Sequence, residues 1–534
     1  MILVTANQMR DMDKQTIESF GIPGRVLMEN AGKGAFDFLL KKFKNLTAKK
    51  IAVMAGRGNN GGDGFVMARY LMEKKIDVTI FLLSSKEKLT GDAKANMDLA
   101  QKLCNLSQNC SIVEIPDAEA FEAQRVKILH HDVFIDAILG TGLNSDVRGF
   151  FKDAIEVINA SSKPIFSVDI PSGLHSDTGQ PLGASVKADA TATFALAKPG
   201  HVLYPGNVYT GDLKVIDIGI PNFIAQEQSI QLSLIEKKEV AACFTPRKFQ
   251  SHKGSFGHLL VIAGSVGKTG AAALCANAAM RCGTGLVTLG VAQSLNQNIE
   301  PLVAEPMTHP LPEQDKGFLS DHCFDEIQTL LKGKQALAIG PGIGTRAGTK
   351  QLVKKLIQTS QVPLIIDADA INCIADDSNI LKQKKVPAIL TPHPGEMARL
   401  CKASPSDIQA DRIGTASRFA SEFNTILILK GAQTIVSFPD GRSCICPTGN
   451  PGMASGGMGD VLTGMIAGFC AQGFSPENAS LAGVYIHGLC ADTLCRDMGG
   501  FGFIATDIIQ TIPKTIHQYV LGKGTHLKSI PAKI

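Results

Sequence analysis

The sequence predicts an α/β protein of two domains, each a parallel sheet covered by helices on both faces. Short runs rich in Val, Ile and Leu alternate with helical patterns along the whole 534-residue chain. These runs are continuously apolar, which is typical of parallel strands that are buried on both faces. The length of the chain also fits two or more domains of ordinary size.

Nine apolar runs are the strongest strand candidates. They cover residues 50–56, 77–83, 132–138, 164–170, 258–264, 336–340, 363–369, 387–393 and 425–431. Many of these runs end in Gly, Asp or His. Ligands of open α/β sheets bind beyond the carboxyl ends of the strands. We therefore expect the functional residues at these strand ends.

The composition excludes several classes of protein. Lys and Arg exceed Asp and Glu by only four, and the chain has no Trp and few Tyr, which argues against a nucleic-acid partner. The N-terminus turns polar after four residues, and the apolar stretch 269–280 is too short to span a membrane. The 13 cysteines are scattered without zinc-site spacing. We expect a cytoplasmic protein with reduced thiols and no membrane partner.

The strand and helix pattern weakens over residues 222–250, where the sequence is polar and irregular. We expect a first domain over 1–222, a linker over 223–250 and a second domain over 251–534. The two domains share no obvious repeat.

A glycine-rich loop follows the first strand candidate. Gly56, Gly58 and Gly61 satisfy the dinucleotide-binding pattern G-x-G-x-x-G, but the strand over 77–83 has no carboxylate at its end to hold a ribose. Asn59, Asn60 and Asp63 in the same loop offer oxygen ligands beside the backbone N–H groups of a helix start. The alternative is that these three side chains only cap the helix.

Two further strand ends in the first domain carry polar residues. Asp136 ends one strand, and Asp169 ends another, followed by Ser172. Asn60, Asp136 and Ser172 could converge as oxygen ligands on one monovalent cation, which leaves Asp169 as an acid or base. Each of these side chains alone could instead stabilise a loop.

The second domain lacks a Walker phosphate loop, because the position five residues before Gly267 is Ile262. A stronger signal is the glycine group Gly456, Gly457 and Gly459 ahead of Asp460, with an apolar helix directly after it. Such a turn directs several N–H groups at one point and can bind a phosphoryl group. Asp460 is then placed to accept a proton from a substrate hydroxyl. The alternative is a simple Asp N-cap.

The ends of the other strands in the second domain supply further polar and glycine positions. They are Gly340, Gly342, Gly344, Asp367, Asp369, His393, Glu396 and Lys430. A lone His or Lys is more often structural. At the ends of successive parallel strands, however, these side chains favour one shared site.

The motifs GRGNNGGDG, DAILGTGL and DIPSGL resemble the epimerase domain of the NAD(P)H-hydrate repair system over residues 1–220. The resemblance implies a Rossmann-like three-layer αβα fold, and potassium bound by Asn60, Asp136 and Ser172. It implies that Asp169 contacts the substrate and shuttles the proton. It also implies a set of residues that hold the hydrated nucleotide: Asn59, Asn60, Gly61, Gly62, Asp63, Gly140, Thr141, Gly142, Leu143, Asn144, Ser145, Asp146 and Asp169.

The motifs GSVGKTGAA, GPGIGT, DADAIN, TPHPGEMARL, KGAQT and NPGMASGGMGD resemble the ribokinase-like NAD(P)H-hydrate dehydratase domain over about 240–520. The resemblance implies a ribokinase-like αβα fold with Asp460 as catalytic base. The residues that it implies for the hydrated nucleotide are Ala271, Gly342, His393 and Asp460. Those that it implies for ADP are Lys430, Gly431, Ala432, Gln433, Thr434 and Gly459.

Together the two resemblances imply a bifunctional enzyme that repairs hydrated NADH and NADPH (NADHX and NADPHX). The first domain would interconvert the R and S hydrates, and the second would dehydrate the S form with ADP as co-substrate and Mg²⁺. The sequence itself leaves ADP against ATP, NADHX against NADPHX and communication between the sites undetermined. It does not determine the oligomeric state either, and our expectation is a homo-oligomer. The alternatives are a small-molecule kinase with an accessory domain and a non-catalytic nucleotide-binding protein.

Overall fold

The computed structural model describes residues 1–521 and divides the chain into two compact units. The N-terminal unit is Ile2–Ile230, and the C-terminal unit comprises Met1 and the chain from Gln231 onward. Residues 522–534 of the expected second domain lie outside the described part. The expected linker 223–250 is irregular only in part. It holds most of α9 (Asn222–Glu227), and all of β8 (Leu232–Leu234) and α10 (Lys237–Ala242), whereas residues 243–250 contain no helix or strand.

The N-terminal unit contains a seven-stranded sheet in which every neighbouring pair is parallel. The strand order is β3-β2-β1-β4-β5-β6-β7. The strands are β1 (Lys50–Ala55), β2 (Asp77–Leu82), β3 (Cys110–Glu114), β4 (Val133–Ala137), β5 (Ile165–Val168), β6 (Ala190–Phe194) and β7 (Asp212–Ile216). The four strands predicted in this half are confirmed as β1, β2, β4 and β5. The other three, β3, β6 and β7, were not predicted.

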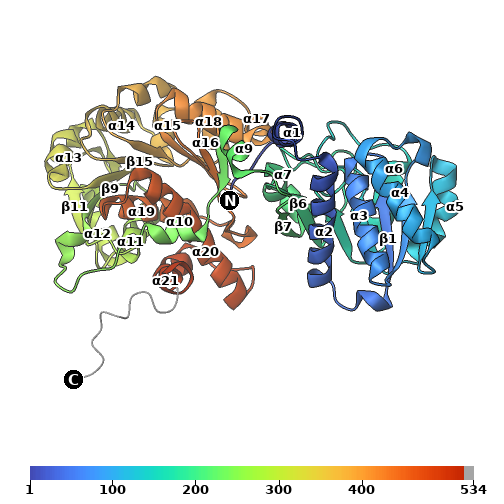
Figure 1. Cartoon of the computed structure of the whole chain (residues 1–534). Helices are drawn as coiled ribbons and strands as arrows, with labels where there is room; N and C mark the ends of the chain where they lie inside the picture. Colours follow the sequence, from blue (N-terminus) through green and yellow to red (C-terminus); the bar gives the residue numbers. More distant parts are fainter. Residues whose placement is uncertain (522–534) are drawn as a thin grey trace. The chain divides into compact units, whose positions relative to one another are not determined.

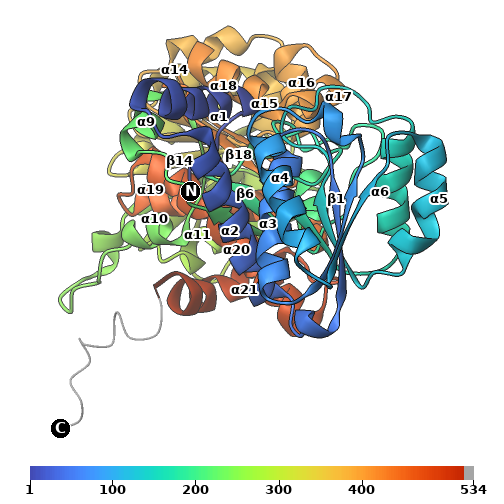
Figure 2. The ribbon, with the colours of Figure 1, turned by 45° about the vertical axis from the view of Figure 1, so that its right-hand side comes forward.

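Helices cover both faces of this sheet, as Figure 2 shows. On one face lie α2 (Gly24–Lys42), α3 (Asn59–Glu73) and α4 (Gly91–Asn105), which share an apolar cluster with the strands. On the other face lie α5 (Ala118–Leu129) and α6 (Phe150–Ala160), with a second cluster. The remaining helices are α1 (Ala6–Lys14) with its π-helical continuation Gln15–Phe20, and the short α7 (Pro199–Val202) and α8 (Gly206–Thr210).

The strand order reverses between β1 and β4, which places a crevice at their carboxyl ends. The loop after β1 and the first turn of α3 lie very close together there. A Cβ atom on Gly61 would lie 2.0 Å from the carbonyl oxygen of Gly56, so only glycine fits. Gly61 lies inside α3, because this helix begins at Asn59, within the glycine pattern.

The C-terminal unit contains a ten-stranded sheet with the order β11-β10-β9-β14-β15-β16-β17-β18-β19-β8. Its strands, besides β8, are β9 (His258–Ile262), β10 (Leu286–Ala292), β11 (Met307–Leu311), β14 (Ala336–Ile339), β15 (Leu364–Ile366), β16 (Ala388–Leu390), β17 (Ile426–Leu429), β18 (Ile435–Ser437) and β19 (Ser443–Ile445). The five strands predicted here are confirmed as β9 and β14 to β17. A separate hairpin joins β12 (Glu313–Asp315) and β13 (Phe318–Leu319).

The expectation of a wholly parallel sheet is wrong for this second unit. The β17–β18 and β18–β19 pairs are antiparallel. Only residues 430–434 connect β17 to β18, and a parallel connection needs a crossover of a dozen or more residues.

The helices of the C-terminal unit also form two layers, as Figure 1 shows. One layer contains α11 (Thr269–Arg281), α19 (Met458–Ala471), α20 (Pro476–Met498) and α21 (Ala505–Thr515), which bury a shared apolar core. The other contains α14 (Ala347–Thr359), α15 (Asp369–Ile374), α16 (Pro394–Cys401) and α18 (Arg412–Glu422). Smaller helices are α12 (Asn296–Ile299), α13 (Phe324–Leu331) and α17 (Pro405–Ala410).

All thirteen cysteines carry free thiols. Within residues 1–521, no helix combines the length and the apolar character needed to cross a bilayer.

The core of the C-terminal unit yields a stability prediction. Phe469 on α19 is fully buried and packs against Phe244 and Phe474, with ring centroids 5.7 and 5.2 Å away. Phe469→Ala should lower the free energy of unfolding of this unit by about 3–5 kcal/mol, measured by urea denaturation. Phe501 is 96% exposed, and Phe501→Ala is the matched control. Equal effects of the two substitutions would contradict this account of the core.

Candidate active sites

A cavity of about 920 Å³ lies at the carboxyl ends of β1, β4 and β5 in the N-terminal unit. This volume suits a small-molecule ligand. Seven of the residues predicted to hold a nucleotide line it: Asn59, Asn60, Asp63, Gly140, Thr141, Gly142 and Asp169. The other six, namely Gly61, Gly62, Leu143, Asn144, Ser145 and Asp146, are not among the lining residues. The structure thus brings seven of these thirteen predicted residues to one cavity.

The side chains at the start of α3 do not cap this helix. Gly58 is the N-cap residue, and no side chain provides a capping hydrogen bond. Asn60 instead donates from Nδ2 to the carbonyl of Leu139 at 3.0 Å, and its Oδ1 is buried without a hydrogen-bond partner. Asp63 is buried, and burial raises its pKa well above the ordinary range. The capping alternative is therefore wrong for these side chains.

The three predicted cation ligands converge on the loop after β4. Asp136 is fully buried and accepts hydrogen bonds from Ser167 Oγ and from the backbone N–H of Ser172, both at 2.8 Å. Ser172 Oγ accepts from the N–H of Leu139 at 2.8 Å, and Asn60 binds the carbonyl of the same residue. Burial raises the pKa of Asp136 despite its hydrogen bonds.

The donor set of this loop suits a monovalent cation. The unpartnered Oδ1 of Asn60 is a free oxygen ligand beside Asp136 and Ser172. Among residues 1–521, no group of three or more His, Cys, Asp or Glu side chains could hold a metal ion. Neutral oxygens together with one carboxyl group are a donor set that a monovalent cation can accept.

Asp169 lies in a strained position directly after β5. Its φ angle is 60°, a left-handed conformation that is uncommon for a non-glycine residue and is often found at functional sites. Its carboxylate accepts from Lys198 Nζ at 2.7 Å and from Thr193 Oγ1 at 3.0 Å. Burial alone would raise the pKa of Asp169, but the charge and hydrogen bond of Lys198 outweigh burial and hold it below its ordinary value. Asp169 is therefore ionised and can act as a base.

Lys198 is a site residue that the sequence analysis missed. Its side chain is only 1% exposed, and its ammonium group is enclosed by Asp169, Thr193 and the carbonyl of Phe194. The neighbouring His201 is neutral, because burial and the charge of Lys198 lower its pKa to about 4. A lysine just after a buried strand (β6) is the one signal in the sequence that could have pointed to it.

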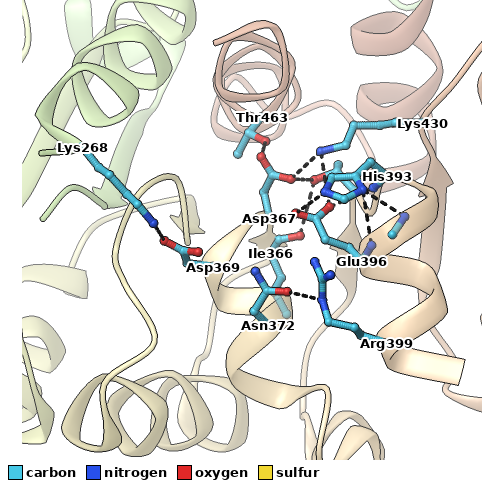
Figure 3. A network of polar contacts seen from close by, with 12 residues as sticks. Lys268, Ile366, Asp367, Asp369, Asn372, His393, Glu396, Arg399, Lys430 and Thr463 are labelled. Carbon is cyan, nitrogen blue, oxygen red and sulfur yellow. Dashed lines mark hydrogen bonds and ion pairs between the residues drawn. The ribbon is translucent and has the colours of Figure 1, made fainter. Parts of the chain in front are cut away.

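The polar residues predicted in the second domain follow adjacent parallel strands of the C-terminal unit. Asp367 and Asp369 follow β15, His393 follows β16, and Lys430 follows β17. Figure 3 shows Asp367, His393 and Lys430 close together, and Asp369 beside Lys268. The glycine turn after β14 adjoins them, since Gly344 donates its N–H to Asp369 at 3.0 Å.

A buried ion-pair network connects these strand ends to α19 (Figure 3). Asp367, with a side chain only 1% exposed, accepts from Thr391 and Thr463 at 2.7 Å and from Lys430 at 2.9 Å. Glu396 lies 3.8 Å from the same ammonium group. Burial lowers the pKa of Lys430, but the two carboxylates outweigh burial and raise it. Because Thr463 belongs to α19, the network fixes this helix against the sheet.

Asp460 lies in the first turn of α19, which begins at Met458 and not after Asp460 as expected. Gly457 is the N-cap residue with a φ angle of 88°, so the alternative of an Asp N-cap is wrong. Among the described residues, the Asp460 carboxylate has no hydrogen-bond partner. Burial, and then the negative charge of Asp367, raise its pKa to about 7. The N–H groups of this first turn have no partner within the helix and can bind an anion.

Two other predicted residues are engaged within the protein. His393 is the N-cap of α16, and its Nδ1 accepts from the N–H groups of Gly395 and Glu396 at 3.0 and 3.3 Å. Its Nε2 lies 3.4 Å from Oε1 of Glu396. Lys430, predicted to contact ADP, is paired with Asp367, although a Cβ on the predicted ADP residue Gly459 would lie 3.3 Å from its Nζ.

The predicted hydrate residues Ala271 and Gly342 adjoin each other: a Cβ on Gly342 would lie 3.2 Å from that of Ala271. Lys268 lies beside them and pairs with Asp369 at 2.8 Å. Lys268 belongs to the motif GSVGKTGAA and Asp369 was a candidate residue, but the sequence did not predict that they pair. The sequence analysis missed Arg412, which donates to the backbone carbonyls of Leu429 and Ala432 in and beside the predicted ADP segment 430–434. Arg412 lies outside the quoted motifs, so no local motif marks it.

A second cavity, of about 610 Å³, lies beside the amino ends of β16 and β17 and includes none of the predicted residues. Asp460 is at the carboxyl ends of the strands and is partly exposed. The candidate site of the C-terminal unit is therefore the strand-end cluster and not this cavity.

Comparison with known proteins finds two families, one for each part of the chain. Two family models match: "NAD(P)H-hydrate dehydratase" over residues 259–514 and "YjeF-related protein N-terminus" over 24–200. Bifunctional NAD(P)H-hydrate repair enzymes of Moorella thermoacetica and Escherichia coli are 39% and 33% identical, over 96% and 97% of this chain and 96% and 95% of their own lengths.

A solved structure, the ADP/ATP-dependent NAD(P)H-hydrate dehydratase of Bacillus subtilis co-crystallised with ATP/Mg²⁺, is 30% identical. It covers 54% of this chain and 98% of its own, with a TM-score of 0.45. The full-length relatives show the family directly, since they match nearly the whole chain in both directions. The chain therefore belongs to the family of bifunctional NAD(P)H-hydrate repair enzymes.

Proposed function

We propose that this chain repairs hydrated NADH and NADPH in two steps. The N-terminal domain, which we propose covers residues 1–222, interconverts the R and S hydrates. The C-terminal domain, which we propose covers residues 251–534, dehydrates the S hydrate with ADP and yields NAD(P)H, AMP and phosphate. The carrying observation is Asp460, an unpartnered carboxyl with a pKa of about 7 at the N-terminus of α19.

Hydroxide is a poor leaving group, so the C-terminal site must convert the hydroxyl of the hydrate into a better one. Asp460 takes the hydroxyl proton, and the freed oxygen attacks the terminal phosphoryl group of ADP, which releases AMP. The C–O bond of the resulting phosphate ester then breaks, phosphate departs, and loss of a proton from the neighbouring ring carbon restores the double bond. The N–H groups at the start of α19 stabilise the charge on the phosphoryl oxygens.

The surrounding residues fit this chemistry. A general base works best when its pKa lies near the operating pH, as that of Asp460 does. The negative charge of Asp367 raises that pKa. The positive charge of Lys430, which pairs with Asp367, opposes the rise. Magnesium, when bound with the nucleotide, neutralises phosphate charge. We propose Ala271, Gly342 and His393 as hydrate contacts, and Gly459 with residues 430–434 as ADP contacts.

In the N-terminal site we propose Asp169 as the base that removes the hydroxyl proton of the hydrate, with Lys198 holding it in the ionised form. Asn60, Asp136 and Ser172 would hold potassium, which supplies a fixed positive charge to the loop after β4. The unpartnered Oδ1 of Asn60 supports this assignment.

We place the protein in the cytoplasm, because thirteen free thiols suit a reducing compartment. A homo-oligomer stays a prediction, to be checked by light scattering.

The overall function is tested with a mixture of R and S hydrates, supplied with ADP, ATP or no nucleotide. With ADP, the full mixture should return to NAD(P)H with release of one phosphate and one AMP for each hydrate, followed by absorbance and phosphate assay. Conversion of only half the mixture would contradict epimerase activity. A stable phosphoester product would instead indicate a small-molecule kinase.

Two substitutions should separate the two activities. Asp460→Asn removes the base of the C-terminal site and should lower dehydration by about 100-fold or more, while epimer exchange continues. Asp169→Ala should slow epimer exchange and leave dehydration of pure S hydrate unchanged. Exchange is measured by NMR and dehydration by absorbance. Loss of both activities in either variant would contradict the assignment of one site to each unit.

The raised pKa of Asp460 predicts the pH dependence of dehydration. The ionised carboxylate is the active form, so the rate should rise with pH through about 7 and fall by about tenfold per pH unit well below it. The profile of kcat for pure S hydrate checks this. An acidic limb centred near pH 4, the ordinary value for Asp, would show that the site does not raise this pKa.

A further inference from the structure

One face of the N-terminal helix forms a wall of the cavity in the N-terminal unit. Five residues of α1 and its π-helical continuation line it: Ala6, Met9, Arg10, Asp13 and Ile17. Their spacing of three and four residues is that of one helix face. Asp13 is the one carboxyl group on this face, and no motif of the loops at the strand ends includes it.

Asp13 shares the cavity with Asp169 and its partner Lys198. Its side chain is partly buried and, among the described residues, has no hydrogen-bond partner. Burial raises the pKa of Asp13 to about 6, Lys198 opposes this, and the negative charge of Asp169 adds to it. The pKa values of the two carboxyl groups therefore differ, since Lys198 holds that of Asp169 below its ordinary value. Paired groups of this kind commonly divide the roles of acid and base.

We propose that Asp13 is a second catalytic residue of the N-terminal site, the acid that works with the base Asp169. This inference rests on the proposed epimerase activity.

An acid and a base together satisfy the proton balance of epimerisation. Asp169 takes the proton of the hydroxyl group, the C–N bond of the ring breaks to leave an aldehyde, and the electron pair goes to the ring nitrogen. Asp13 gives its proton to that nitrogen. Rotation about the bond next to the aldehyde presents its other face, and the same transfers in reverse close the ring. No other reactant is consumed.

The other charged groups that line the cavity suit this role less well. They are Arg10, Arg57, Asp63, Lys88 and Asp92. The basic side chains are poor acids near neutral pH. Asp92 lies 3.7 Å from Arg25 and so already has a charged partner. Asp63 is more deeply buried than Asp13, and burial raises its pKa.

His201 and Lys198 are engaged with Asp169. The Nε2 of His201 binds the carbonyl of Asp169 at 2.9 Å, and its Nδ1 accepts from the N–H of Lys198 at 3.0 Å. The ammonium of Lys198 is held by Asp169 and Thr193. Both side chains therefore position Asp169, and Asp13 is left as the proton donor.

The test measures epimer exchange by NMR in the full chain, without nucleotide, so that the dehydratase is silent. Asp13→Asn should lower kcat for exchange by about 100-fold with little change in KM, because the amide cannot donate the proton. Asp11→Asn is the matched control: Asp11 is exposed on the same helix and does not line the cavity. Thermal unfolding of both variants checks that the fold is kept.

The pH profile of the wild-type protein provides a second readout that needs no variant. The protonated form of Asp13 is active, so exchange should slow as pH rises through about 6. Exchange by Asp13→Asn within about threefold of wild type would overturn the proposal, since an acid contributes about 100-fold or more. So would a wild-type profile with no limb near this pH. Absence of exchange in the wild type would instead overturn the epimerase activity itself.

Discussion

Burial disfavours the charged form of a carboxyl group, and this constraint shapes both candidate sites. The strand ends of the two sheets bring Asp136, Asp169, Asp367 and Asp460 into partly or fully buried positions. A buried charge left without a partner costs about 3–5 kcal/mol. Asp169 and Asp367 each have a lysine, at 2.7 and 2.9 Å, whereas Asp136 has only neutral donors. Asp460 has no hydrogen-bond partner among the described residues, and burial raises its pKa to about 7.

This constraint separates the roles of the carboxyl groups. Asp169, whose pKa Lys198 lowers, is our proposed base, and Asp367, which pairs with Lys430, supports the network that holds α19. Where compensation is incomplete, the group can exchange a proton near neutral pH, as Asp460 and Asp13 can. The two units thus reach similar chemistry with different neighbours, because protonation depends on local charge more than on residue type.

Much of the fold could be predicted from the sequence, because the pattern of buried parallel strands is local. All nine strand candidates are strands in the structure. Strand length does not decide which strands could be predicted, because β15 and β16 have three residues each and were predicted, whereas the seven-residue β10 was not. The sequence analysis placed the start of α19 too late, because it took Gly459 for part of the loop, although Gly457 is the residue that caps the helix.

The candidate sites could be predicted only as far as the strand ends. Asp136, Asp169, Asp367 and Asp460 follow or adjoin motifs, so local sequence pointed to them. Lys198 and Asp13 lie far from these motifs in the chain and reach the cavity only through the folded arrangement of β6 and α1. Neither secondary-structure propensity nor the spacing of residues in the sequence predicts such a contact. The charge state of each carboxyl depends on the same long-range neighbours and therefore could not be predicted either.

The central claim is that burial raises the pKa of Asp460, whereas Lys198 outweighs burial and lowers the pKa of Asp169. The most direct measurement follows the side-chain carboxyl signals of ¹³C-labelled aspartate by NMR as a function of pH. Asp460 and Asp169 would be assigned by comparison with their Asn variants. The account predicts that Asp460 titrates near 7 and Asp169 below the ordinary value of about 4. Titration of both groups near that ordinary value would contradict it.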